Sequence, residues 1–381
     1  MQHLGTKTPP HRVHGLADDA VAPDWPPLEN GEVEALFDAF PALRGPAAIT
    51  WRSPRPLSAA ARVRTRAGEV FVKRHHVDVR NSATLAVEHA FMAHLRRNGM
   101  PVVEVLADAA SATAIARGAW TYEVHALARG IDLYRDSPSW SPLTDLGQAR
   151  TAGRMLARLH RAAVGFDAPQ RDTFVLVSRD DCVRAPELFA AIQAQLPARP
   201  ALDAYLSRRD WRAELAPLAQ RQHAVQPRLA SLPSLWTHND WHISNLCWSA
   251  ATGNAAISTV IDFGLTARTF ALYDLATAIE RNAIAWLHLD RGDQAIFPET
   301  ARALIDGYAE VLPLAPGRRE LLADLLPIVH IDYALSEIGY YEGITHSPAH
   351  ADVAWYTFLL GHAAWFDSRP GRALLRALAQ P

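Results

Sequence analysis

The chain has few cysteines and no long apolar run, and these absences exclude several classes of protein. Cys182 and Cys247 cannot build a disulfide framework, and neither has metal-ligating neighbours at a recognisable spacing. No stretch approaches the roughly 18 consecutive apolar residues of a transmembrane helix. Residues 1–27 lack the apolar segment of a signal peptide and are expected to form an irregular leader. The sequence therefore predicts a cytoplasmic protein with no membrane partner.

The chain also lacks a large charge of one sign. Its 38 Lys and Arg residues oppose 40 Asp and Glu residues, which gives a formal net charge of −2. Such a balance provides no strong field for binding nucleic acid, although it does not exclude a local patch. With 381 residues, 49% of them hydrophobic, the chain is too long for one ordinary domain and fits two lobes.

Residues 28–128 have the pattern of a small β-rich lobe with one main helix. Alternating apolar residues predict a β-meander, and a period of three to four residues predicts a helix that stops at Asn98-Gly99. The expected strands cover 48–52, 60–66, 69–74, 112–116 and 120–126, and the expected helix covers 82–98. Residues 129–381 are expected to form a larger, mainly helical lobe, with helices over 145–163, 186–195, 211–229 and 330–342.

The helical region contains two short motifs that together supply the groups of phosphoryl transfer. Residues 238–245 read His-x-Asp-x-His-x-x-Asn, and an apolar strand then ends in Asp262-Phe263-Gly264. Phosphoryl transfer needs one carboxylate at the attacking hydroxyl, and an amide oxygen with a second carboxylate to hold magnesium. Taken singly, each residue has a simpler explanation as a core histidine, a turn or a cap. The ordered set at this spacing favours the catalytic interpretation.

This double motif resembles the catalytic and metal loops of protein-kinase-like enzymes. Asn239 precedes the Asp and His242 stands where protein kinases have Lys, so the closer resemblance is to the aminoglycoside phosphotransferase family, which includes choline, ethanolamine, homoserine and hydroxylysine kinases. The resemblance implies an α+β, two-lobed protein-kinase-like fold that binds ATP (or GTP) and Mg²⁺. It implies Asp240 as the base or orienter of the acceptor hydroxyl, with His242 near the transferring phosphoryl group. It implies Asn245 and Asp262 as metal ligands.

The resemblance also implies nucleotide-binding residues in the small lobe. Lys73 is expected to neutralise phosphate charge, and Glu88, 15 residues later on the helix, is expected to orient it. The backbone near Glu123 and His125 is expected to contact adenine. Each residue alone would be an edge charge or a solvated face.

The turn expected to cover the phosphates departs from the protein-kinase pattern. It reads Ser-Pro-Arg-Pro-Leu-Ser over residues 53–58 and contains no glycine. Ser58 or Arg55 is therefore expected to donate to phosphate in place of a glycine-rich backbone. The alternative is a proline-stiffened hairpin with an exposed Arg.

The acceptor is the part of the function that the sequence specifies least. Tyr333, Glu337 and Tyr341 recur every four residues and share one helix face, where rings and a carboxylate would suit an ammonium group. The alternative is ordinary packing of an aromatic stripe.

The expected activity is transfer of the γ-phosphate to a small-molecule hydroxyl, on an amino alcohol, an amino sugar or aminoglycoside, or a related metabolite. The alternatives are a catalytically weak nucleotide-binding regulatory protein and a protein Ser/Thr kinase, although no activation segment ending in Ala-Pro-Glu is recognisable. A monomer or homodimer is expected.

Overall fold

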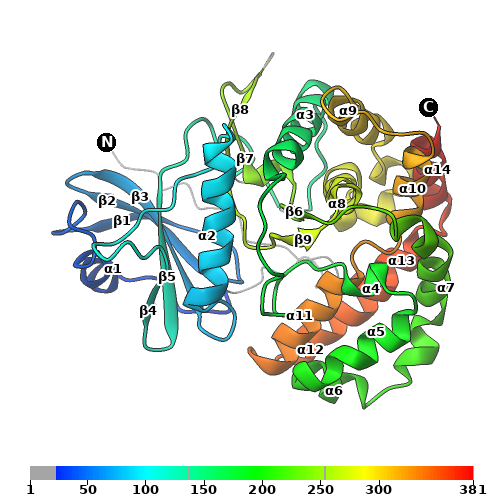
Figure 1. Cartoon of the computed structure of the whole chain (residues 1–381), viewed down its shortest axis with the longest axis horizontal. Coiled ribbons are helices and arrows are strands. Elements are labelled where there is room, and N and C mark those ends of the chain that lie inside the picture. Colours follow the sequence, from blue (N-terminus) through cyan, green and yellow to red (C-terminus); the bar gives the residue numbers. More distant parts are fainter. Residues whose placement is uncertain (1–22, 136, 139, 253–254, 381) are drawn as a thin grey trace.

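The computed structural model describes residues 23–135, 137–138, 140–252 and 255–380, and it confirms the two-lobed α+β fold. Figure 1 shows the β-sheet at one side of the molecule and the helices from α3 onward at the other, with α2 beside the boundary. The small lobe consists of α1 (Asn30–Phe37), β1 (Ala48–Arg52), β2 (Ala59–Thr65), β3 (Gly68–His76), α2 (Ser82–Arg97), β4 (Ile115–Arg117) and β5 (Trp120–Ala126).

The five strands form one antiparallel sheet in the order β1-β2-β3-β5-β4. Gly68 has a φ of +128°, which an L side chain rarely adopts, so it permits the tight turn from β2 into β3. Helix α2 begins where the Asn81 side chain accepts the Thr84 backbone N–H, which is an N-cap contact. The pairing of β3 with β5 sets Lys73 opposite Glu123.

The large lobe is built mainly of helices. The longer ones are α3 (Leu146–Ala163), α5 (Leu188–Gln195), α7 (Trp211–Leu229), α8 (Ala271–Ala283), α9 (Pro298–Ala309), α10 (Arg318–Leu325), α11 (Ile331–Gly343) and α14 (Arg369–Ala379). The shorter ones are α4 (Asp181–Arg184), α6 (Pro200–Leu206), α12 (Pro348–Asp352) and α13 (His362–Trp365), joined by the irregular helical segments η1 (Leu196–Ala198), η3 (Trp286–Ala295) and η4 (Val353–Gly361).

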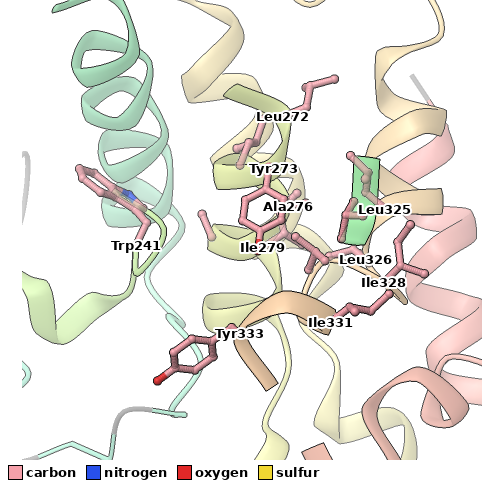
Figure 2. Close-up of a cluster of buried hydrophobic side chains, with 14 of the residues drawn as sticks. Trp241, Leu272, Tyr273, Ala276, Ile279, Leu325, Leu326, Ile328, Ile331 and Tyr333 are labelled. Atoms are coloured by element: carbon pink, nitrogen blue, oxygen red, sulfur yellow. The ribbon is translucent and has the colours of Figure 1, made fainter. Parts of the chain in front are cut away.

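Helix α8 lies inside this lobe and provides much of its core. Its apolar side chains lie in one cluster with residues from the end of α10 and the turn after it, as Figure 2 shows for Ile279, Leu325 and Leu326. Helices α3 and α9 approach closely because Gly153 and Gly307 carry no side chain; a Cβ on either would meet a backbone oxygen of the other helix at 2.0 Å. Among the described residues, no helix combines the length and apolar character that crossing a membrane requires.

Two short hairpins connect these helices to the motif residues. β6 (Leu235–Thr237) pairs with β9 (Ala267–Thr269), and β7 (Leu246–Trp248) pairs with β8 (Ile257–Val260). The 3₁₀ turn η2 (Ile243–Asn245) precedes β7. Because Leu246 is opposite Val260, the residues just before β7 and just after β8 lie at the same end of the hairpin.

The end of the expected leader is ordered and bonded to both lobes. The Asp24 N–H donates to Pro56 O at 3.1 Å, and the Tyr340 hydroxyl of α11 donates to Asp24 at 2.8 Å. Residues 23–27 form neither a helix nor a strand, yet Asp24 ties this segment to both lobes; residues 1–22 lie outside the described part. The polar side chain of Asp24 could not reveal these partners in the sequence.

Candidate active site

Side chains of helix α8 fix the position of the 238–245 loop by hydrogen bonds. The carboxylate of Asp274 accepts the backbone N–H groups of His238 at 2.9 Å and Asn239 at 2.8 Å. At the far end of the helix, the Asn282 amide donates to Trp241 O at 2.7 Å. Asn239 has a φ of +62°, an uncommon conformation for a non-glycine residue, so these bonds fix a strained turn. The loop is therefore rigidly placed over α8.

His238 braces this loop rather than facing the reacting groups. Its Nε2 lies 3.1 Å from Ile261 O, and its Nδ1 accepts the Asp240 backbone N–H at 3.2 Å. This pair of contacts requires the neutral tautomer with the proton on Nε2. His238 thus links the catalytic loop to the strand that leads to Asp262.

Asp240 is surrounded by donors on both carboxylate oxygens. Its Oδ2 lies 3.1 Å from Asn245 Nδ2 and 3.4 Å from His242 Nε2, and its Oδ1 lies 3.7 Å from Arg281 Nη2. Burial alone would raise the pKa of Asp240, but His242 and then Arg281 hold that pKa well below its usual range. The carboxylate is therefore ionised, as a proton acceptor must be.

The β7–β8 hairpin brings Asn245 and Asp262 together. Ile261 donates its N–H to Asn245 O at 3.0 Å. The Asn245 amide nitrogen is taken by Asp240, which leaves its Oδ1 as an acceptor. The Asp262 side chain is 46% exposed, and the residue has a φ of +59°. One amide oxygen and one accessible carboxylate are the oxygen ligands that a hard divalent cation prefers, so the pair fits magnesium.

Lys73 forms an ion pair with Asp262 at 3.0 Å. Burial would lower the pKa of Lys73, but the charges of Asp262, Glu123 and Glu88 together raise it above its usual value. The ammonium is therefore fully charged and lies at the group that would bind metal.

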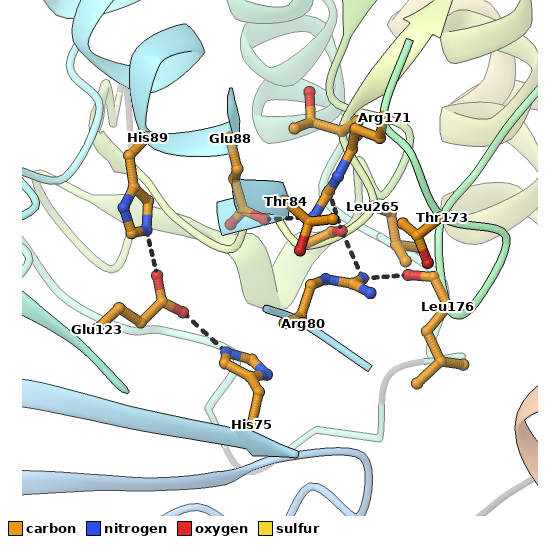
Figure 3. A network of polar contacts seen from close by, with 12 residues as sticks. His75, Arg80, Thr84, Glu88, His89, Glu123, Arg171, Thr173, Leu176 and Leu265 are labelled. Atoms are coloured by element: carbon orange, nitrogen blue, oxygen red, sulfur yellow. Dashed lines mark hydrogen bonds and ion pairs between the residues drawn. The ribbon is translucent and has the colours of Figure 1, made fainter. Parts of the chain in front are cut away.

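The expected pairing of Glu88 with Lys73 is not what the structure shows. Glu88 forms an ion pair with Arg171 of the large lobe at 3.1 Å, as Figure 3 shows. The Arg171 side chain is fully buried, and Nη1 also donates to the carbonyls of Gly264 at 2.8 Å and Thr266 at 3.1 Å. The buried charge of the Arg171 guanidinium is stabilised by a carboxylate partner. Lys73 already has such a partner in Asp262.

Arg80 reinforces the same junction. Its guanidinium donates to the carbonyls of Gly264 at 2.9 Å, Val175 at 2.8 Å and Leu176. Two arginines therefore hold Gly264 next to Asp262. Sequence analysis did not identify either one, because Arg80 and Arg171 are ordinary arginines in an arginine-rich chain until the fold brings them to one carbonyl.

Glu123 and His125 are not placed to contact adenine through their backbones. They lie inside β5 opposite Lys73 and Phe71 of β3, and on the other edge Val124 O and the Ala126 N–H are bonded to residues 106 and 104. The chain leaves the sheet only after Ala126, so the lobe connection begins at Leu127. The strand was correctly expected to end at Ala126, but the adenine contacts were assigned to residues inside the strand rather than beyond it.

The Glu123 side chain instead accepts from three imidazoles. His89 Nε2 and His125 Nε2 both lie 2.8 Å from Oε2, and His75 Nε2 lies 3.0 Å from Oε1. Burial would raise the pKa of Glu123, but His125 and the other two imidazoles hold it well below its usual range. Glu123, at the centre of this polar cluster, is the residue of β5 that pairs with Lys73 of β3.

The glycine-free turn brings Arg55 to the catalytic loop. Arg55 Nη2 donates to Ser244 Oγ at 3.2 Å, and Ser244 Oγ lies 2.8 Å from His242 Nδ1. Burial lowers the pKa of Arg55, while the charges of Asp240 and Asp262 oppose that shift. The turn is therefore not a hairpin with an exposed Arg. The role of Ser58, which is half-buried in the same turn, stays a prediction.

The three expected acceptor residues do not have equal surroundings. The Tyr333 ring lies 5.7 Å from the guanidinium of Arg281, so the protein itself supplies a cation there. Burial raises the pKa of Glu337 to about 7, although the charge of Arg281 acts in the opposite direction. Tyr341 packs against the rings of Tyr340 and His350, both at 5.2 Å. Arg281 was missed by sequence analysis, although it lies two helical turns after Asp274.

The chain is similar in sequence to known phosphotransferases. The sequence profile of the phosphotransferase enzyme family matches residues 57–321, more than half of the chain. A homoserine kinase from Gluconobacter oxydans (strain 621H) is 28% identical over 186 residues, which make up 49% of this chain and 51% of that protein. The chain thus aligns with about half the length of this curated relative.

Two solved structures share the fold. The microcompartment-associated aminopropanol kinase has a TM-score of 0.55 and 18% identity, with 92% of this chain and 99% of that chain covered. The amicoumacin kinase hAmiN, solved with AMP-PNP, Ca²⁺ and Ami, has a TM-score of 0.57 and 13% identity, with 87% and 93% covered. Since the family profile covers β2 to β5 of the small lobe, the 238–245 loop and Asp262, this chain belongs to the phosphotransferase enzyme family.

Proposed function

We propose that this protein transfers the γ-phosphate of ATP (or GTP), with Mg²⁺, to a hydroxyl group of a small molecule. Two contacts support this most: Lys73 forms an ion pair with Asp262, and the Asn245 amide donates to Asp240. These residues come from a small-lobe strand, from the 238–245 loop before β7 and from the position just after β8. Their convergence supplies a phosphate-binding cation, two metal ligands and a base within one site.

Each residue has a distinct role in this proposal. Asp240 accepts or orients the acceptor's hydroxyl proton while its ionised state is maintained by His242 and Arg281. Asn245 and Asp262 would hold the divalent cation, which neutralises charge on the phosphates. Lys73 and Arg55 contribute positive charge to the phosphates, so that catalysis consists mainly of positioning and electrostatic stabilisation. Adenine would lie near the lobe connection that begins at Leu127.

A nucleotide-binding test can use the scarcity of lysine. The sequence contains only Lys7 and Lys73, so a lysine-reactive ATP affinity label has two targets. We expect the label to modify Lys73, Mg-ATP to protect it, and Lys7 to serve as the unprotected control within the same peptide map. Labelling of Lys73 that Mg-ATP does not reduce would contradict the nucleotide site.

Turnover is tested by ATP consumption over amino alcohols, amino sugars, aminoglycosides and hydroxy amino acids, with phosphorylated products identified by mass spectrometry. Protection of Lys73 without turnover of any acceptor would support the regulatory alternative. Phosphorylation confined to protein Ser or Thr would support a protein kinase. The family match to small-molecule phosphotransferases favours neither of these.

A cytoplasmic location is part of the same proposal, because ATP is the donor and both cysteines are free and buried. A monomer or homodimer stays a prediction, to be measured by sedimentation.

A further inference from the structure

Arg281 is a buried cation without hydrogen bonds beside the catalytic base. It lies on α8, is 6% exposed, and makes no hydrogen bond to any residue that the structure describes. Its contact with Asp240 Oδ1 is 3.7 Å, longer than a hydrogen bond. Its Nε is buried with no hydrogen-bond partner among the described residues, and leaving a buried donor unmet is costly. The group therefore has unused capacity to bind an anion.

Two aromatic rings lie next to the Arg281 guanidinium. Its centre lies 4.2 Å from the Trp140 ring and 5.7 Å from the Tyr333 ring. A guanidinium that lies over an aromatic ring keeps the N–H groups of its edge for a planar acceptor. The two aromatic residues come from the segment before α3 and from α11, so the large lobe fixes the group from two sides.

The position of Arg281 separates it from the phosphate-binding groups. Asp240 Oδ2 faces Asn245 and His242, whereas Oδ1 faces Arg281. Lys73 and Asp262 are paired to each other and come from the small lobe and the β7–β8 hairpin. Arg281 therefore adjoins the base on the carboxylate oxygen that faces away from Asn245 and His242.

We propose that Arg281 binds a carboxylate of the acceptor, which makes the substrate a hydroxy acid rather than a plain amino alcohol. The proposal rests on the proposed phosphotransferase function and narrows its acceptor. A carboxylate matches the guanidinium edge with two parallel N–H···O bonds, which Asp240 at 3.7 Å does not make. Glu337, which lies on the α11 face next to Tyr333, would take an amine if the acceptor carries one. A short 2-amino acid with a terminal hydroxyl satisfies all of these groups.

The test uses acceptors that differ by one group. Homoserine and 3-aminopropanol share the hydroxyl, the amine and their spacing, and only homoserine has the carboxylate; 4-hydroxybutanoate has the carboxylate without the amine. We expect the wild-type protein to show a kcat/KM for homoserine at least tenfold above that for 3-aminopropanol. Turnover of 3-aminopropanol at an equal or higher kcat/KM would overturn the proposal, without needing any variant.

The variants Arg281→Gln and Arg281→Lys add a second, independent measurement. We expect Arg281→Gln to lower kcat/KM for homoserine by about 10- to 150-fold, the range for loss of a charged hydrogen bond, mainly through KM. The same change should lower kcat/KM for 3-aminopropanol by a smaller factor, because both acceptors lose the support that Arg281 gives to the ionised Asp240 but only homoserine also loses a carboxylate contact. Arg281→Lys should recover part of the homoserine activity. Arg150→Gln, which removes an exposed partner of Glu310, serves as the control.

Three outcomes would contradict the assignment. An equal loss for both acceptors, together with a shift of the acidic limb of the pH–rate profile, would show that Arg281 only positions and ionises Asp240. A rise in the KM for ATP would place Arg281 at the phosphates. Normal homoserine activity in Arg281→Gln would show that the carboxylate binds elsewhere. Failure of the phosphotransferase function itself would look different, since wild-type protein would then phosphorylate none of the acceptors.

Discussion

Replacing Glu88 with Gln tests which of two roles this residue has. The sequence pattern assigns it to the orientation of Lys73, whereas in the structure it neutralises Arg171 at 3.1 Å. Both side chains are almost fully buried, with exposed fractions of 3% and 0%. Removing one partner of such a pair leaves an uncompensated buried charge and costs about 3–5 kcal/mol.

The lower end of that range applies here, because Arg171 keeps the carbonyls of Gly264 and Thr266 as acceptors. At about 2.1 cal/mol/K per residue, two-state unfolding of a chain of this length has an entropy of about 0.8 kcal/mol/K. A loss of about 3 kcal/mol therefore lowers Tm by about 4 °C. The Kd for Mg-ATP should change by less than about threefold, because Asp262 and not Glu88 pairs with Lys73.

The assay combines thermal unfolding by circular dichroism with calorimetric titration of Mg-ATP. Glu104→Gln is the matched control, since Glu104 and its partner Arg96 are 55% and 41% exposed. An exposed pair contributes at most about 1 kcal/mol, so this control should shift Tm by about 1 °C or less. A Glu88→Gln protein with an unchanged Tm and a tenfold weaker Kd would refute this reasoning and restore the role predicted from sequence.

Three further predictions concern the catalytic groups. Asp240→Asn should reduce the transfer rate by about 10²–10⁴ while calorimetric Mg-ATP affinity stays near that of the wild type, and a variant retaining a tenth of the rate would argue against a base. Asp262→Ala should weaken nucleotide binding in the presence of Mg²⁺ more than in EDTA, since it removes a proposed metal ligand; equal effects in both buffers would count against that role. If Glu337 binds an amine, the KM for homoserine should fall as pH rises through about 7, because burial raises the pKa of its carboxyl to that value and only the ionised form attracts a cation. That trend should disappear in Glu337→Gln, and its persistence would assign the titration to another group.

The strands and helices of this protein were predictable where periodicity and turn residues agree. The expected strands over 48–52 and 120–126 and the expected helix over 211–229 have the bounds of β1, β5 and α7. The reason is local: alternation, helical period and the Gly or Pro residues that end elements act over a few neighbours. The motif at 238–245 was also recognisable, because its residue types occur at a fixed spacing that can be identified without knowledge of the rest of the fold.

What the sequence could not specify is which distant charges meet. Glu88 faces Arg171 rather than Lys73, and Glu123 turns into a cluster with three histidines, because the depth of burial around each cation decides where a carboxylate is needed most. Arg281 is one arginine among the 38 basic residues of the chain until α8 places it 3.7 Å from Asp240. The sequence alone thus determined the fold class and indicated the candidate phosphoryl-transfer groups. The tertiary structure decided which charges pair, since this depends on long-range packing and desolvation.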